Sequence, residues 1–123
     1  MGSYSSPSYA NINDKAILDP TVLAGTLMMS EKCTRFNMLA GSSALFDGDY
    51  SLQVQNRDNS WSEIQNGFQG PGFVRTGSDA LNANINGDMK FPYEVRILCK
   101  TQATLGVCTL YLIADPPPAN PLF

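Results

Sequence analysis

A chain of 123 residues is long enough for one hydrophobic core and too short for two, so we expect a single domain. Hydrophobic residues make up 43% and charged residues only 15%, so Ser, Thr, Asn, Gln and Gly must cover much of the surface. The net charge is −3 and the eight Lys and Arg residues are scattered singly along the sequence, which argues against a nucleic-acid partner.

Residues 1–20 are predicted to be an N-terminal arm, because their apolar and aromatic residues are spaced irregularly among Ser, Asn and Asp. Two interpretations stay open: an extended segment that docks onto a neighbour, or a disordered tail in which residues 14–18 form at most one helical turn. The candidate contact residues of this arm are Tyr4, Tyr9 and Ile12.

Residues 115–123 are predicted to be a stiff, proline-rich C-terminal tail whose last two residues, Leu122 and Phe123, seek an apolar groove. The first residues of the chain lack the basic and apolar regions of a secretory signal, and no apolar run is long enough to cross a bilayer. We therefore expect synthesis in the cytoplasm and no membrane partner.

Residues 21–114 are predicted to form an antiparallel β-sandwich of the jelly-roll type. Short runs with an apolar residue at every second position are separated by Gly, Asn, Asp and Pro, which is typical of all-β domains. The expected strands are residues 22–29, 35–39, 50–55, 60–64, 72–76, 80–85, 93–100 and 107–113.

The last two expected strands alternate so regularly that a hairpin between them is predicted, with its turn at residues 103–104. In the register that keeps every inward position apolar, Cys99 faces Cys108, as two thiols or as a disulfide. The predicted core residues here are Val95, Ile97, Cys99, Cys108, Leu110 and Leu112. The opposite face is half apolar, and either a contact surface or a second small core would explain Glu94, Arg96, Leu98, Tyr111 and Ile113.

The only tryptophan of the chain follows a tight polar turn, Asn-Arg-Asp-Asn at residues 56–59. We expect this turn to fold the chain back so that Trp61 covers the apolar face of the preceding strand, formed by Tyr50, Leu52 and Val54. The alternative is an exposed Trp61 that binds sugars beside the polar turn.

No catalytic, metal or cofactor site is predicted. The chain has no histidine to act as a base, and its three cysteines fit no zinc spacing. Two acidic stretches, Asp-Gly-Asp at residues 47–49 and the turn at residues 56–59, could suggest calcium, but turn chemistry explains both better. We therefore expect a protein that is not an enzyme.

The sequence LFDGDYSLQVQNRDNSWSEI at residues 45–64, with PYEVRI at 92–97 and VCTLYL at 107–112, resembles a pattern of small bacteriophage virion proteins. The resemblance covers about residues 39–114; the N-terminal arm and the proline-rich tail depart from it. It implies a structural virion protein, a capsid decoration (cement) protein that sits as a homotrimer on the outer capsid surface and braces the major capsid protein. The alternative function is a carbohydrate-binding β-sandwich module of a phage tail or fibre.

Overall fold

Alternating apolar and polar residues build eight strands in the part of the chain that the computed structural model describes, residues 12–66, 72–78 and 89–117. The strands are β1 (Ile12–Leu18), β2 (Leu27–Cys33), β3 (Arg35–Ser42), β4 (Asp49–Gln55), β5 (Trp61–Asn66), β6 (Gly72–Ser78), β7 (Tyr93–Thr101) and β8 (Cys108–Asp115). These residues contain no helix, so the fold is all-β.

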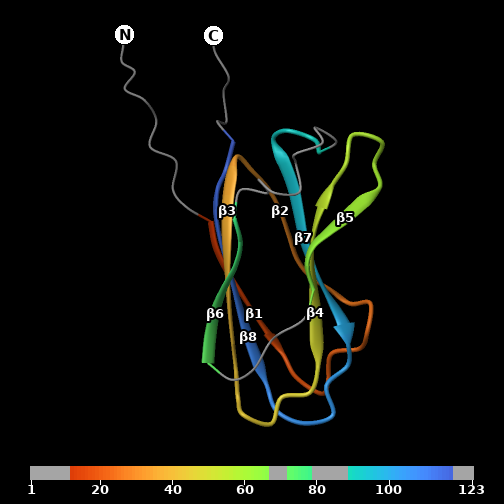
Figure 1. Ribbon diagram of the computed structural model, residues 1–123, viewed down its shortest axis with the longest axis vertical. Helices are drawn as coiled ribbons and strands as arrows, with labels where there is room; N and C mark the ends of the chain where they lie inside the picture. The colour runs from red at the N-terminus through yellow and green to blue at the C-terminus, as the bar shows by residue number, and fades with distance from the viewer. Residues whose placement is uncertain (1–11, 67–71, 79–88, 118–123) are drawn as a thin grey trace, which may run out of the picture.

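The strands form two antiparallel sheets that face each other (Figure 1). Sheet A has the order β1-β8-β3-β6, and sheet B has the order β2-β7-β4-β5. Neighbours within a sheet are mostly distant in sequence, so the chain crosses repeatedly from one sheet to the other. Among the strands that the structure describes, only β4 and β5 are both consecutive and paired.

The core lies between the two sheets and is built by the strict alternation of β7 and β8. Tyr93, Val95, Ile97 and Cys99 of β7 point inward, as do Cys108, Leu110, Leu112 and Ala114 of β8. Nine of the ten residues predicted for the core are at most 1% exposed: Tyr50, Leu52, Val54, Val95, Ile97, Cys99, Cys108, Leu110 and Leu112. Burying a side chain of this size contributes roughly 1.5–3 kcal/mol, so this face is the main source of stability.

The predicted β7–β8 hairpin is wrong. β7 pairs with β2 and β4 in sheet B, whereas β8 pairs with β1 and β3 in sheet A. Alternation gave the inward face of each strand correctly, but two inward faces can lie side by side in one sheet or opposite each other across a core. Cys99 and Cys108 are therefore not cross-strand neighbours, and both are buried thiols outside any disulfide.

The boundary of the predicted N-terminal arm also needs correction, because residues 12–18 are not an arm or a helical turn. They form β1, which pairs along its whole length with β8, from Ile12 opposite Ala114 to Leu18 opposite Cys108. The strand expected at residues 22–29 is displaced to β2, and the strand expected at residues 80–85 lies outside the described residues.

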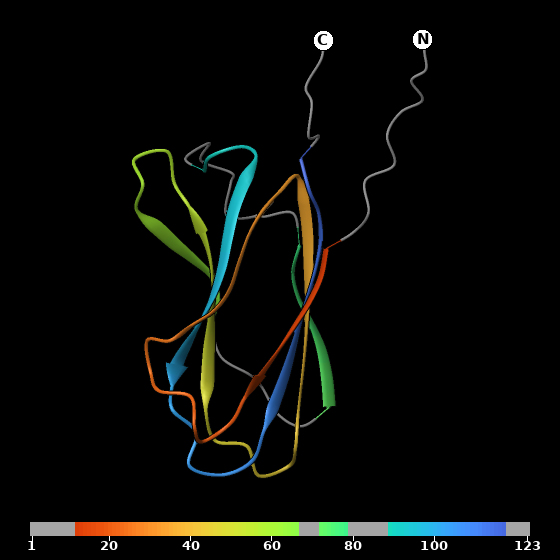
Figure 2. The same cartoon turned by 180° about the vertical axis from the view of Figure 1, so that it is seen from behind.

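The two ends of the sandwich differ in what they carry. The chain enters β1 and leaves β8 at the upper end in Figures 1 and 2, where the β4–β5 turn and the start of β7 also lie. The loops β1–β2, β3–β4 and β7–β8 meet at the lower end. These two ends present the surfaces considered below.

Candidate functional site

The predicted contact residues of the two arms lie mostly beyond the structural description. Tyr4, Tyr9, Leu122 and Phe123 are outside the described residues. Ile12 is the first residue of β1, and its half-buried side chain packs against the core. Ile12 therefore belongs to the sandwich rather than to a free arm.

Trp61 lies on the outer face of sheet B instead of closing the core. It pairs with Gln55, whose side chain points away from the core because its neighbour Val54 points inward. Residues directly opposite each other in a sheet project to the same side, so Trp61 projects outward too. The guanidinium of Arg96 stacks over its ring, 3.8 Å from the ring centroid, which leaves the indole half-buried.

The side chains around Trp61 bind one another in a row along sheet B. Arg96 Nε donates to Gln53 Oε1 at 2.7 Å, and Gln53 Nε2 donates to Ser51 Oγ at 3.0 Å. Ser51 Oγ donates to Glu63 at 2.5 Å, and Lys100 Nζ lies 3.4 Å from the same carboxylate. The row positions Arg96 against the indole.

The polar turn before Trp61 is held by its own side chains. Asn59 adopts a left-handed backbone conformation with φ of 73°, which Asn tolerates better than most residues. Asp58 Oδ1 accepts hydrogen bonds from Ser60 Oγ at 2.5 Å and Ser60 N at 2.9 Å. These two bonds, the side-chain one first, lower the pKa of Asp58. The carboxylate is thus engaged in the turn itself.

The lower end of the sandwich carries a network that fixes the β3–β4 loop to the β7–β8 loop. Asp47 Oδ1 accepts hydrogen bonds from Thr104 N at 2.7 Å and Leu105 N at 3.0 Å, while Asp47 Oδ2 accepts from Thr104 Oγ1. Donation from the Thr104 hydroxyl, and then from the Leu105 and Thr104 amides, lowers the pKa of Asp47. Beside it, Ser43 N donates to Val107 O at 2.9 Å, and Val107 N donates to the Ser43 hydroxyl at 3.0 Å.

The β1–β2 loop is fixed to the same end by backbone bonds to sheet B. Gly25 N donates to Cys99 O at 2.7 Å, and Cys99 N donates to Thr26 O at 2.9 Å. Gln102 Nε2 donates to Pro20 O at 2.8 Å. All three loops are therefore held in place although they lie at the surface.

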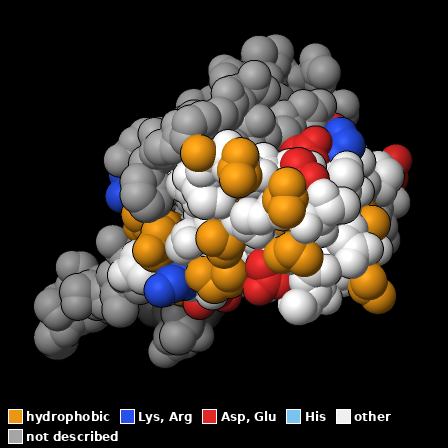
Figure 3. Space-filling view, turned by 90° about the horizontal axis from the view of Figure 1, so that it is seen from below, with side chains coloured by type: hydrophobic (Ala, Val, Ile, Leu, Met, Phe, Trp, Pro, Cys, Tyr) orange, Lys and Arg blue, Asp and Glu red, His pale blue; other side chains and the backbone are white. Residues whose placement is uncertain are grey.

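These fixed loops present large apolar side chains to solvent, and we call the four residues together the apolar loop end. Its members, with their exposed fractions, are Leu45 (70%), Leu23 (62%), Leu105 (55%) and Val107 (38%). Figure 3 shows hydrophobic side chains gathered on this end of the molecule, with acidic side chains among them. Grouped, exposed apolar side chains are typical of protein-interaction sites.

Sequence reasoning did not select the four members of the apolar loop end. A signal was available for Leu45 and Leu105, which are large aliphatic residues in stretches rich in Gly, Ser, Thr or Asp, where turn chemistry predicts a loop. Leu23 and Val107 fall inside expected strands, so no such signal marks them. A loop leucine has no strand or helix face to bury it. Only the fold, however, brings the three loops to one end.

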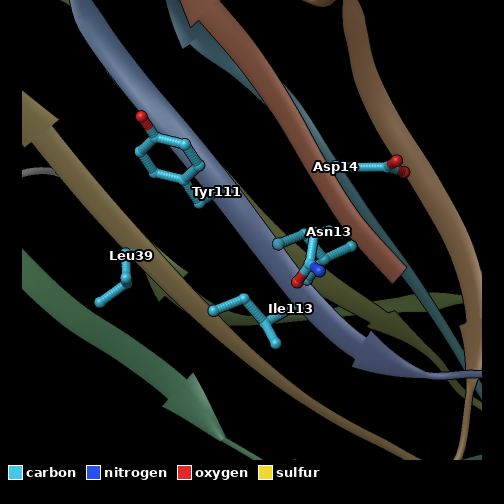
Figure 4. Close-up of a pocket in the computed structure, with 6 residues that line it drawn as sticks. Asn13, Asp14, Leu39, Tyr111 and Ile113 are labelled. Atoms are coloured by element: carbon cyan, nitrogen blue, oxygen red, sulfur yellow. The ribbon is translucent and has the colours of Figure 1, made fainter. Parts of the chain in front are cut away.

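A shallow pocket of about 380 Å³ lies on the outer face of sheet A (Figure 4). Leu39, Tyr111 and Ile113 supply its apolar side chains and Asn13 lies at its edge. Lys15 Nζ stands 5.9 Å from the centroid of the Tyr111 ring. Tyr111 and Ile113 were expected on one face with Glu94 and Arg96, but those two residues project from the other sheet.

The described residues contain no group of three or more His, Cys, Asp or Glu side chains that could hold a metal ion. Within the same ranges, no helix is long and apolar enough to cross a bilayer. Neither a protein-family model nor a curated protein sequence matches the chain.

Proposed function

We propose that this chain is a structural virion protein without enzymatic activity, a capsid decoration (cement) protein that binds and braces the shell of the major capsid protein. The observation that supports the proposal most is the apolar loop end, where exposed aliphatic side chains stand on loops that are already fixed. A pre-ordered apolar surface loses less conformational entropy when it docks than a flexible one does, so more of the free energy of its burial is left for binding.

Within this proposal the sandwich is a jelly roll. Its support is the strand order, β1-β8-β3-β6 facing β2-β7-β4-β5, in which eight strands alternate between two antiparallel sheets. In such a fold the connecting loops collect at the two ends of the sandwich, where they can present a contact surface while the sheets hold them.

The proposal includes a homotrimer on the outer capsid surface, assembled after synthesis in the host cytoplasm. Several copies joined together would multiply weak contacts by avidity, which suits a domain with a small apolar end. Contacts by the segments that carry Tyr4, Tyr9, Leu122 and Phe123 remain part of the proposal. Deletion of residues 1–11 tests the first segment without removing β1.

The experiment is co-sedimentation of the purified protein with assembled capsid shells. The variant Leu45→Asp/Leu105→Asp places two charges on the apolar loop end, and we expect its binding to fall by about a hundredfold, because two contacts of roughly 1.5 kcal/mol each are lost. Ile17→Asp/Leu27→Asp is the matched control, because it adds the same two charges at exposed apolar residues (41% and 54% exposed) that project from strands and not from the three loops.

Retained binding of the control with loss of binding of the double variant supports the proposal. Equal co-sedimentation of the wild type and the double variant would overturn the role of the apolar loop end. Failure of the wild type to sediment with shells would overturn the capsid function itself.

A second candidate function, a carbohydrate-binding module of a phage tail or fibre, is favoured by one observation. Trp61 stands on the outer face of a sheet, beside a row of fixed polar side chains, rather than in the core. Sugars bind by stacking on an indole while polar groups orient their hydroxyls. Arg96 already covers one face of the ring, so a sugar would have to use the other.

A further inference from the structure

The fold gathers three cations around one pocket at the end of the sandwich opposite the apolar loop end. This pocket of about 370 Å³ is lined by Lys32, Arg57, Lys90, Phe91, Pro92 and Glu94, and we call it the basic pocket. Lys32 is the last residue but one of β2, and Arg57 lies in the β4–β5 turn. Lys90, Phe91 and Pro92 precede β7, and Glu94 is the second residue of that strand. In Figure 1 the β4–β5 turn and the start of β7 lie at the upper end.

In the part of the chain that the structure describes, the cations of the basic pocket form no ion pair with a carboxylate, although Glu94 lies opposite Lys32 in the β2–β7 register. Ion pairs within that part join Arg35 to Asp115 and Lys100 to Glu63, and neither involves the pocket. Lys90 Nζ donates to the neutral amide oxygen of Gln55 at 3.0 Å, which holds the ammonium in place without removing its charge. Glu94 is the one carboxylate in the lining, so the described wall carries a positive excess.

This positive pocket belongs to a chain whose net charge is −3. Like charges repel, so clustering three cations costs free energy unless an anion relieves the repulsion. Lys32 and Arg57 are exposed and project from different elements, which lets a ligand reach both.

An exposed aromatic ring forms the apolar wall of the basic pocket. Phe91 is 67% exposed, yet its ring is fixed edge-on against Tyr93, with 5.1 Å between the centroids. Tyr93 in turn packs edge-on against the buried Phe36, with 5.9 Å between those centroids. The ring is therefore anchored to the core through two aromatic contacts while most of its surface stays open to a ligand.

We propose that the basic pocket binds an acidic peptide segment of a partner protein. Carboxylates of the segment pair with Lys32 and Arg57, and an apolar side chain next to them covers Phe91. The volume lies in the range of ligand-sized pockets, which admits a few side chains rather than a whole domain surface.

A nucleic acid fits this pocket less well than an acidic peptide does. Phosphate backbones are bound by a track of many cations, about 6–10 in proteins that bind duplexes strongly. Here three cations surround a single pocket, and the carboxylate of Glu94 in the lining would repel a phosphate. A peptide can place its carboxylates beside Lys32 and Arg57 and direct an amide N–H toward Glu94.

The site stands independently of the proposed capsid function. Because the basic pocket and the apolar loop end lie at opposite ends of the sandwich, one molecule can hold two partner segments of different chemistry at once. With both sites occupied, the domain joins two partner segments instead of covering one.

The test is fluorescence anisotropy with a labelled peptide, Glu-Asp-Phe-Glu-Asp-Glu, against the full chain. The comparison peptide replaces each acid by its amide. We expect the acidic peptide alone to bind, with affinity that falls as salt is raised. The variant Lys32→Ala/Arg57→Ala should weaken binding by about tenfold or more, as expected for the loss of two charged contacts.

Two further variants separate the pocket from general charge. Lys15→Ala/Lys100→Ala removes the same number of cations from other sites and should change affinity by less than about twofold. Phe91→Ala keeps every cation and should weaken binding about fivefold by removing the apolar wall. Urea unfolding of each variant checks that the fold is kept.

Three results would overturn the proposal. One is the absence of acidic-peptide binding by the wild-type chain, and another is equal weakening in the pocket variant and the control variant. The third concerns a single-stranded oligonucleotide of matched charge. If it binds more tightly than the peptide, and if the same pocket variant abolishes that binding, the pocket is a general polyanion site.

Discussion

Gly106 is the point at which the β7–β8 loop touches the β3–β4 loop, and its replacement tests how the apolar loop end is held. Gly106 adopts a left-handed conformation with φ of 78°. A Cβ added there would lie 2.6 Å from both N and Cα of Phe46 and 2.7 Å from Ser43 Oγ. Backbone atoms cannot turn away as a flexible side chain can, so the two loops must separate.

The cost of Gly106→Ala has two parts. A non-glycine residue in the left-handed region loses about 1 kcal/mol. Forcing one more carbon into a packed contact costs roughly 2 kcal/mol more. We therefore expect Gly106→Ala to lower the free energy of unfolding by about 3 kcal/mol, the sum of these two estimates.

Gly25→Ala is the matched control, because Gly25 also has a positive φ, 92°, but an added Cβ would meet no atom within 4 Å. Only the conformational part applies there, so we expect a loss of about 1 kcal/mol. Urea unfolding in reducing buffer, followed by circular dichroism, measures both losses. With a slope of about 1.5 kcal/mol per molar urea, the midpoints should fall by about 2 M and about 0.7 M.

Equal midpoint shifts for the two glycine variants would refute the reasoning, because they would mean that the contact with Phe46 contributes nothing. A larger loss for Gly106→Ala, together with weaker binding to capsid shells, would show that the contact between the loops also shapes the docking surface.

Two further predictions concern Glu31 and Trp61. A hydrogen bond with Asp14, then burial and the charge of Asp14, raise the pKa of Glu31 from 4.5 to about 7. Glu31 thus binds its proton more tightly in the folded protein than in the unfolded chain. Its contribution to stability is fully present below pH 4.5 and is lost as the pH rises towards 7. The full shift would correspond to about 3 kcal/mol, but water screens this half-exposed group, so we expect about 1 kcal/mol. Glu31→Gln should flatten the profile in urea titrations at several pH values, and an unchanged slope would contradict the assignment. For Trp61, no sugar on a glycan array should bind the protein if the capsid function holds. A sugar that shifts the fluorescence of Trp61, and whose binding Trp61→Ala abolishes, would instead establish the carbohydrate function.

The sequence by itself determined the all-β class and the inward face of most strands. Alternation in β7 and β8 assigns Val95, Ile97, Leu110 and Leu112 to the core because successive side chains of a strand must point to opposite sides. The polar turn at residues 56–59 was likewise readable, since its hydrogen bonds are local.

Local patterns could not determine which strands pair, because an inward face carries no information about its neighbour. This is why alternation alone predicts a hairpin between β7 and β8, and why the sequence of β1, with Asn13, Asp14 and Lys15 at its centre, predicts an arm. Trp61 projects outward because the turn places it opposite Gln55. A shift of one residue in the β4–β5 register would turn its side chain to the other face of the sheet.

Both candidate binding surfaces were decided by the tertiary structure alone. The leucines of the apolar loop end come from three separate loops, and the cations of the basic pocket come from three separate segments. Each of these residues looks isolated in the sequence. They become neighbours only because repeated crossings between the two sheets bring distant segments to the same end of the sandwich.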